Sequence, residues 1–195
     1  MITVRAPHTG ELLGEVEEAT REDVLAALSR GRAAFVAWAS LGFEGRARVM
    51  RKVRDHLVRH RAHVLDRLIL ETGKVRGEAL LEISIMLETF AYYLNHGGEA
   101  LADRDVSPRL LRNKRGRVCY QPRGVVGIIS PWNFPLDLSF GECIPALLAG
   151  NAVLVKPSEF TPLIAIEMRR LAVEAGLDPG LFQVLTGAGE TGAAL

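Results

Sequence analysis

Hydrophobic and polar positions in the first half of the chain follow helical periods. After an alternating segment at residues 2–16, which predicts a hairpin, apolar residues recur at three- and four-residue spacing along three long stretches. These stretches predict one helix over 20–38, a long or once-broken helix over 44–72, and a third helix over 75–94. Thr20 stands three residues before Asp23, a spacing that predicts a capping box at the start of the first helix.

The second half of the chain switches between two periods. Short apolar runs at 125–130, 151–156 and 181–185 are bounded by glycine, proline or polar residues, and longer apolar runs at 136–149 and 163–175 lie between them. Strands that alternate with helices predict a parallel sheet with crossover helices. The β-branched run at 125–130 is typical of a strand buried on both faces. The fold class predicted is α/β, a helical N-terminal segment followed by half of a Rossmann-like sheet.

Single residues predict where these elements end. Gly73 and Gly150 are placed to end helices in the left-handed conformation. Thr161 and Pro162 form an N-cap and first-turn pair for the helix that follows them. Pro145 is expected to kink the crossover helix.

Residues 103–123 separate the two halves and are unusually basic. A turn at 113–116 between two extended pieces predicts a projecting β-ribbon. The expected domains are therefore a hairpin and helical part at 1–102, the ribbon at 103–123, and a nucleotide-binding unit at 124–195. The basic residues of the ribbon are Arg104, Arg109, Arg112, Lys114, Arg115, Arg117 and Arg123. They fit either a nucleic-acid surface or an exposed ribbon, and the second interpretation is favoured because the formal net charge of the chain is only +1.

Composition narrows the class of protein. The charge gives no sign of a polyanion-binding surface, and the sequence shows no signal peptide and no run long enough to span a bilayer. We therefore expect a cytoplasmic protein with no nucleic-acid or membrane partner. Two cysteines, Cys119 and Cys143, are too few for a disulfide scaffold and have no context that marks an activated thiol.

Three histidines share one helical face. His56, His60 and His63 have a spacing that a metal site could use, but arginines surround them and neither a cysteine nor a carboxylate pair is near in sequence. A polar helix flank is the favoured interpretation, and no metal site is predicted.

Polar turns follow the first two predicted strands. Ser130-Pro131-Trp132-Asn133 follows the first strand, and Pro157-Ser158-Glu159 follows the second. Ligands of parallel sheets bind beyond the carboxyl ends of the strands, so these turns are the expected site. Residues 187–192 also match G-x-G-x-x-G, the pattern of a pyrophosphate-binding loop. Because they follow the third strand instead of the first, an ordinary strand-to-helix turn is the alternative to a cofactor-binding loop.

The two turns carry a family resemblance. SPWNFP followed by IPALLAGNAVLVKPSE resembles the NAD(P)-dependent aldehyde dehydrogenases, and the similarity extends upstream to LETGK and downstream through GLFQVLTGAGETGAA. The resemblance implies a site at the ends of the two strands. Asn133 corresponds to the asparagine that holds the aldehyde oxygen while a thiolate attacks. The alternative is an asparagine whose side chain only stabilises the turn. The implied cofactor-binding residues are Ile129, Ser130, Pro131, Trp132, Lys156, Ser158, Glu159 and Gly189.

The resemblance also sets expectations for cofactor and activity. The Glu159 carboxylate can accept hydrogen bonds from both ribose hydroxyls and would repel a 2′-phosphate, so NAD is expected rather than NADP. Chains of the family are more than twice this long, and their nucleophilic cysteine and general-base glutamate would lie after residue 195. We therefore expect the cofactor-binding part of an enzyme that oxidises a small-molecule aldehyde to a carboxylic acid, inactive alone. The alternative is a non-catalytic dinucleotide-binding or assembly module.

The same comparison bears on assembly. In the family the ribbon belongs to the oligomerisation surface, and the strand at 125–130 is expected at an unpaired sheet edge. The expected partners are a second copy of the chain or a separate chain that covers this edge.

Overall fold

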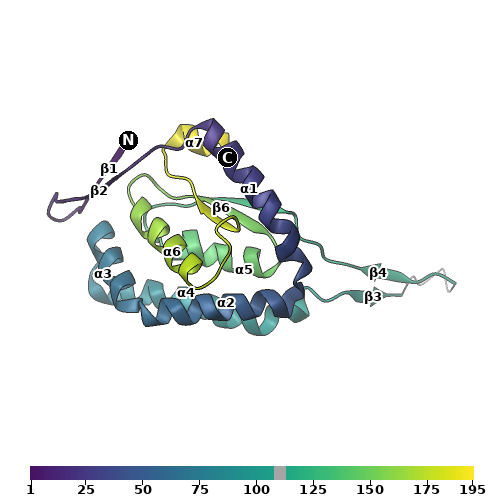
Figure 1. Ribbon diagram of the computed structural model, residues 1–195. Coiled ribbons are helices and arrows are strands. Elements are labelled where there is room, and N and C mark those ends of the chain that lie inside the picture. The colour runs from purple at the N-terminus through teal and green to yellow at the C-terminus, as the bar shows by residue number, and fades with distance from the viewer. Residues whose placement is uncertain (108–112) are drawn as a thin grey trace.

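Helices surround a small parallel sheet, and a ribbon and a hairpin extend from this body (Figure 1). The computed structural model describes residues 1–107 and 113–195, so Arg109 and Arg112 of the basic segment lie outside the described residues. The elements are β1 (Ile2–Arg5), β2 (Leu12–Val16), α1 (Arg21–Ser40), α2 (Gly42–Arg59), α3 (Arg61–Thr72), α4 (Arg76–Ala100), β3 (Arg104–Val106), β4 (Gly116–Val118), β5 (Val125–Ile129), η1 (Asp137–Gly141), α5 (Glu142–Leu148), β6 (Ala152–Lys156), α6 (Pro162–Glu174), β7 (Phe182–Val184) and α7 (Gly189–Ala194).

The N-terminal elements follow the predicted pattern closely. β1 and β2 form the antiparallel hairpin. Thr20 Oγ1 accepts a hydrogen bond from the Asp23 backbone N–H, and the Asp23 carboxylate accepts one from the Thr20 N–H, so the capping box is confirmed. The once-broken alternative for 44–72 is the correct one, because α2 ends at Arg59 and α3 begins at Arg61.

The predicted end of the third helix, near Leu94, is wrong. α4 continues through Gly97 and Gly98 to Ala100. A Cβ on Gly97 would lie 2.8 Å from the Phe43 ring and one on Gly98 would lie 3.0 Å from it. The two glycines therefore let α2 approach α4 closely, and this packing outweighs their low helix propensity. Leu80 of this helix is 45% exposed, so it does not lie on the buried face.

The parallel sheet has the strand order β5-β6-β7. All five residues of β6 are buried. β5 lies at the edge, as expected, but the prediction that it is buried on both faces is wrong, since Ile129 is 61% exposed. An edge strand gains cover from one neighbour only, and its apolar sequence does not reveal this.

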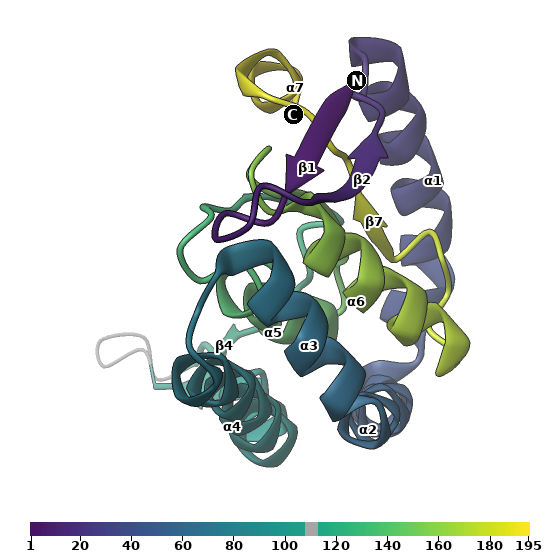
Figure 2. The same ribbon diagram turned by 90° about the vertical axis from the view of Figure 1, so that its left-hand side faces the viewer.

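Helices cover both faces of the sheet (Figure 2). On one face, Leu154 of β6 packs in a small cluster with Val24 and Ala27 of α1. On the other face, Val153 and Val155 belong to the large core that α2 to α6 share. The alternation of β6 side chains thus joins two hydrophobic cores.

The crossover segment differs from a simple kinked helix. It begins as a π-helix, η1, and continues as α5, within which Pro145 lies. A proline has no N–H to donate to the residue four positions earlier, and its ring would clash with that residue's carbonyl. The wider turn of η1 ends at Gly141, four residues before Pro145, which is where that irregularity is expected.

Two glycine caps are confirmed, but the Thr161 cap is not. Gly73 ends α3 with φ 71°, and Gly150 follows α5 with φ 99°. Thr161 makes no side-chain capping bond to α6, and its buried hydroxyl has no hydrogen-bond partner. The Glu71 carboxylate of α3 caps α6 instead, accepting from the backbone N–H groups of Leu163 at 2.6 Å and Ile164 at 2.8 Å.

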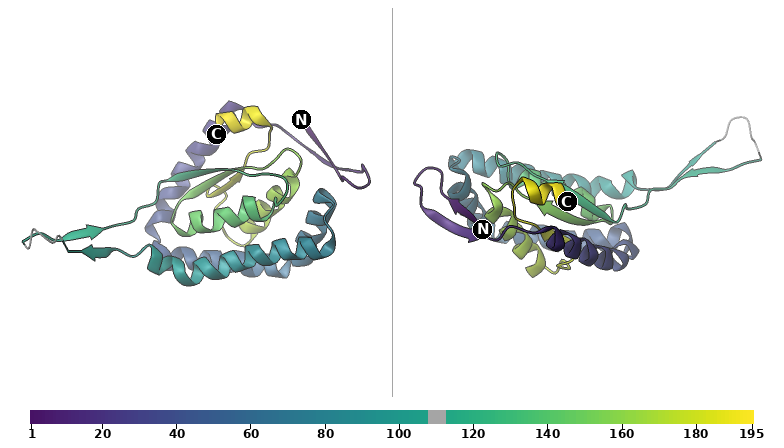
Figure 3. Two further views of the ribbon diagram at one scale, coloured as in Figure 1. Left: turned by 180° about the vertical axis from the view of Figure 1, so that it is seen from behind. Right: turned by 90° about the horizontal axis from the view of Figure 1, so that it is seen from above.

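The ribbon projects well away from the body (Figure 3). β3 and β4 pair in antiparallel fashion from Arg104 opposite Val118 to Val106 opposite Gly116, so the extended pieces are confirmed. The residues of β3 are exposed. Taken over residues 1–107 and 113–195, no helix combines the length and apolar character needed to cross a membrane.

Candidate functional site

The two polar turns leave the sheet side by side. Ile129 pairs in parallel register with Lys156, and the Ser130 N–H donates to the Lys156 carbonyl at 3.0 Å. The turns that begin at Ser130 and Pro157 therefore diverge from adjacent strand ends at one edge of the sheet.

Lys156 connects two loops at this edge. Its side chain is buried, and Nζ donates to the Pro157 carbonyl at 2.8 Å and to the Gly187 carbonyl at 2.9 Å. The Glu159 carboxylate lies 4.0 Å from the same nitrogen. The lysine thus holds the turn after β6 against the loop after β7, with its charge beside the Glu159 carboxylate.

The glycine-rich loop has two different surroundings along its length. A Cβ on Gly187, with φ 157°, would lie 1.9 Å from Thr191 Oγ1. A Cβ on Gly192 would lie 3.4 Å from the Lys156 side chain and 3.8 Å from Ile129 Cδ1, so α7 packs closely on the strand ends. Gly189, the residue singled out from the sequence, is exposed at the first position of α7.

The turn after β5 presents its side chains outward. Pro131, Trp132 and Asn133 are exposed, and Trp132 has an exposed fraction of 59%. Ser130 differs from them, because its hydroxyl is buried and has no hydrogen-bond partner. Asn133 has no side-chain hydrogen bond among those the described residues form, so its amide is free to donate.

The turn after β6 combines a buried hydroxyl with exposed groups. Ser158 is buried, and its Oγ accepts from the Phe160 N–H at 3.3 Å. The Glu159 side chain keeps 40% of its surface exposed, and Phe160 is 65% exposed. An accessible carboxylate therefore lies beside apolar surface at the same sheet edge.

Three charged residues that support the turns were not predicted from the sequence as site residues. Glu71 caps α6. Glu82 forms an ion pair with Lys74 and accepts the Leu136 N–H, just after the turn that carries Asn133. The sequence signal for two of them is the segment LETGK, which contains Glu71 and Lys74 and carries part of the family resemblance.

Neither cysteine has the properties of a nucleophile. Cys143 is fully buried in α5, and burial raises the pKa of its thiol well above the ordinary value. Cys119 is exposed just after β4. Desolvation, followed by the neighbouring Asp103 carboxylate, raises the pKa of the Cys119 thiol. A raised pKa leaves less thiolate at neutral pH.

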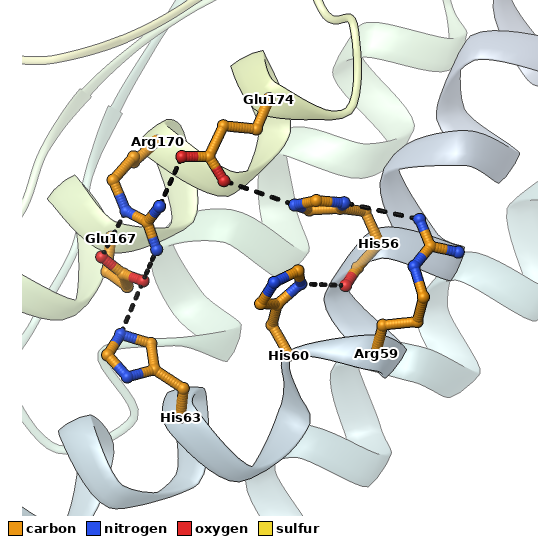
Figure 4. A network of polar contacts seen from close by, with 7 residues as sticks. All are labelled: His56, Arg59, His60, His63, Glu167, Arg170 and Glu174. Atoms are coloured by element: carbon orange, nitrogen blue, oxygen red, sulfur yellow. Dashed lines mark hydrogen bonds and ion pairs between the residues drawn. The ribbon is translucent and has the colours of Figure 1, made fainter.

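The three histidines contact acidic or backbone groups and lie at the break between α2 and α3 (Figure 4). His56 Nε2 lies 3.4 Å from the Glu174 carboxylate, and His63 Nε2 lies 2.8 Å from that of Glu167. Arg170 lies between the two glutamates of α6, and its hydrogen bonds lower the pKa of Glu167. Within the described residues, no three His, Cys, Asp or Glu side chains form a group that could hold a metal ion.

The residues at the sheet edge fit a dinucleotide. Hydrogen-bonding groups come from the unpartnered hydroxyl of Ser130 and the accessible carboxylate of Glu159. Ile129 and Trp132 offer exposed apolar surface for stacking. Gly192 has no side chain that would fill the space beside Lys156 and Ile129.

Comparison with known proteins gives matches over the whole chain. The model of the aldehyde dehydrogenase family matches residues 1–195. A Mycobacterium tuberculosis protein provisionally named succinate-semialdehyde dehydrogenase (NADP+) 2 is 38% identical over 187 residues, which are 96% of this chain and 36% of that protein. The chain thus spans about a third of the length of the curated relatives it matches.

Solved structures give the same result. An NADP-dependent enzyme of E. coli has a TM-score of 0.93 at 32% identity, over 99% of this chain and 40% of that one. PnpE of Pseudomonas sp. WBC-3, in complex with nicotinamide adenine dinucleotide, has a TM-score of 0.91 at 31% identity, over 100% of this chain and 40% of that one.

Proposed function

The chain belongs to the aldehyde dehydrogenase family, and from that premise we propose that it forms the dinucleotide-binding part of an enzyme that oxidises an aldehyde to a carboxylic acid. The observation that carries the proposal is the hydrogen bond from the Ser130 N–H to the Lys156 carbonyl, which brings the two polar turns to one sheet edge. A nicotinamide cofactor bound there would accept the hydride that leaves the aldehyde carbon.

Glu159 supports NAD as the cofactor. Its half-exposed carboxylate lies 4.0 Å from Lys156 Nζ and can accept hydrogen bonds from the two hydroxyls of the adenosine ribose. A 2′-phosphate at this position would meet the same negative charge. The M. tuberculosis relative carries NADP in its name, whereas PnpE was solved with NAD, so the preference of this chain rests on Glu159.

Asn133 supports the oxidation chemistry. We assign its free amide the role of donating a hydrogen bond to the aldehyde oxygen as negative charge develops there. The thiols of Cys119 and Cys143 have raised pKa values, so we assign the attacking thiolate and the base for hydrolysis to residues outside 1–195. The chain alone is then expected to bind NAD without turning over aldehyde.

The ribbon supports assembly into oligomers. β3 and β4 project from the body and present backbone edges that β-strands of another copy can pair with. We propose that this segment is the assembly domain and that residues 124–195 form the nucleotide-binding unit with the helical part at 1–102.

Calorimetric titration tests the cofactor. NAD is expected to bind the chain, and Glu159→Gln is expected to weaken it about tenfold, since hydrogen bonds to a charged group contribute about 1.5–3 kcal/mol. NADP should bind the variant more tightly than it binds the unaltered chain. Glu88→Gln removes the same charge from an exposed position of α4 and serves as the control.

Two results would count against the proposal. NAD that produces neither heat nor a thermal shift would leave the chain without a cofactor role. Aldehyde-dependent NADH formation by residues 1–195 alone would refute the assignment of the thiolate to residues elsewhere. If a chain of the relatives' full length that contains this sequence bound NAD and still turned over no aldehyde, a dinucleotide-binding module without catalysis would be favoured.

A further inference from the structure

The connection between α3 and α4 reaches both candidate turns. It contains Glu71 on the last turn of α3 and Lys74 just before α4, separated by the left-handed cap at Gly73. Both charged side chains point into the molecule, where Glu71 is 2% exposed and the Lys74 side chain is 15% exposed. Neither lies in the two turns themselves, and the burial of two charges in one short segment calls for an explanation.

Glu71 fixes the segment after β6. Its two carboxylate oxygens each accept one backbone N–H from the first turn of α6, at 2.6 Å from Leu163 and 2.8 Å from Ile164. Because Thr161 does not cap this helix, Glu71 supplies the capping bonds. Only Phe160 to Pro162 separate Glu159 from the first capped residue, so the position of the carboxylate depends on this cap.

Lys74 and Glu82 fix the segment after β5. Glu82 is fully buried on α4, and its Oε1 accepts the N–H groups of Leu136 at 2.8 Å and Asp137 at 3.2 Å. Its Oε2 pairs with Lys74, whose Nζ also lies 4.0 Å from the centre of the Phe134 ring. Asn133 thus immediately precedes a residue held by Lys74.

We propose that Glu71, Lys74 and Glu82 are positioning residues that hold the two turns in register, so that the turn with Asn133 and the turn with Glu159 line one dinucleotide site. The proposal rests on the cofactor role given above. Its physical basis is that one helix connection anchors both turns by side-chain hydrogen bonds to backbone N–H groups, which are more directional than apolar contacts. None of the three is assigned a contact with cofactor or substrate.

NMR on the full chain tests the anchoring directly. Lys74→Met is expected to speed amide exchange at Leu136 and Asp137 about tenfold and to increase the fast motion of the Asn133 amide, with Leu163 and Ile164 unchanged. Glu71→Gln should have the opposite distribution, with faster exchange at Leu163 and Ile164 only. General loss of stability would speed exchange at all four amides together.

Matched variants separate positioning from charge alone. Lys52→Met removes an exposed lysine of α2, and Glu78→Gln removes an exposed carboxylate one turn before Glu82 on α4. Neither is expected to change exchange at the four amides. Lys74→Arg keeps the cation beside Glu82 and should restore most of the protection that Lys74→Met removes. Glu82→Gln should affect the same two amides as Lys74→Met, Leu136 and Asp137. If Glu82→Gln fails to fold, exchange in Lys74→Met still tests the anchoring.

Binding of NAD at a temperature well below the unfolding transition gives the functional readout. Each positioning variant is expected to weaken NAD binding about fivefold or more, whereas Lys52→Met and Glu78→Gln bind as the unaltered chain does. Faster local exchange with unchanged NAD affinity would overturn the proposal and leave ordinary helix caps. If the unaltered chain does not bind NAD, the cofactor role fails by itself, and unchanged exchange at Leu136 and Asp137 in Lys74→Met would overturn the anchoring as well.

Discussion

Buried charged side chains gather where loops meet the sheet and its helices. Arg46 Nε donates to the Leu148 carbonyl at 2.9 Å at the end of α5, Lys156 donates to two loop carbonyls, and Glu71 and Glu82 accept backbone N–H groups. A buried charge without such partners would cost several kcal/mol. These residues therefore hold loops in place that apolar packing alone does not define.

Glu71 predicts a pH dependence of stability. Desolvation raises the pKa of Glu71 from 4.5 to about 7, against the opposing hydrogen bonds from Leu163 and Ile164. Because the folded-state pKa lies above the unfolded value, the associated stabilisation is complete below pH 4.5 and is lost as the pH rises through 7. The free energy of unfolding of the unaltered chain, relative to that of Glu71→Gln, should fall by about 3 kcal/mol over this range.

Urea denaturation in buffers across this pH range measures that difference. Glu78→Gln, which alters an exposed carboxylate, should run parallel to the unaltered chain at every pH. A relative stability that rose with pH would mean that the two backbone donors outweigh desolvation, contrary to the expected direction.

Local geometry decides the behaviour of the element that joins β7 to α7. Gly187 and Gly189 belong to the same G-x-G-x-x-G segment, yet a Cβ would meet Thr191 Oγ1 at 1.9 Å at the first and nothing within 4 Å at the second. Thr191 is itself held, since its Oγ1 donates to the Ala19 carbonyl at 2.8 Å. The first glycine is therefore required by packing within the turn, and the second is not.

Alanine substitutions should separate the two glycines. Gly187→Ala is expected to lower the free energy of unfolding by about 1–3 kcal/mol, because rotation of Thr191 cannot relieve a contact that also involves its Cβ at 2.5 Å. Gly189→Ala should be neutral or stabilising by less than about 1 kcal/mol, since alanine is the better helix former. Equal unfolding midpoints for the two variants in urea would show that the turn tolerates a side chain.

The whole molecule combines a double core with an appendage that adds little to it. Phe140 of η1 packs between Phe90 of α4 and Phe182 of β7, with ring centroids 6.0 and 5.2 Å away, and so joins the helical layer to the sheet. The ribbon of β3 and β4 lies outside this core and is mostly exposed. Stability and assembly are therefore expected to depend on different parts of the chain.

Removal of the ribbon tests that separation. Arg104 and Val118 lie opposite each other at the base of the ribbon, so a short glycine-serine link can replace residues 104–118. The shortened chain should unfold within about 0.5 kcal/mol of the full chain at high dilution but sediment as a smaller assembly at micromolar concentration. Asp105→Ala, which breaks only the ion pair to Arg117 within the ribbon, is the control and should assemble normally. Unchanged sedimentation after removal would place the association surface elsewhere.

Much of the fold follows from local sequence. Helical spacing, the Thr20 capping box and the glycine caps at Gly73 and Gly150 each act over a few neighbouring residues, so the sequence predicted them correctly. The same holds for the strand-helix-strand order that puts Asn133 and Glu159 after adjacent strands, which is as far as the sequence locates the candidate site.

Tertiary structure decided what depends on residues distant in sequence. The exposure of Ile129 follows from the strand order, the continuation of α4 through Gly97 from the approach of Phe43, and the cap of α6 from Glu71, ninety-two residues before Leu163. Each of these is set by which side chain or strand fills the adjacent space, and no local period carries that information. The sequence by itself determined the elements and the turns, and long-range packing determined which charged groups hold those turns in place.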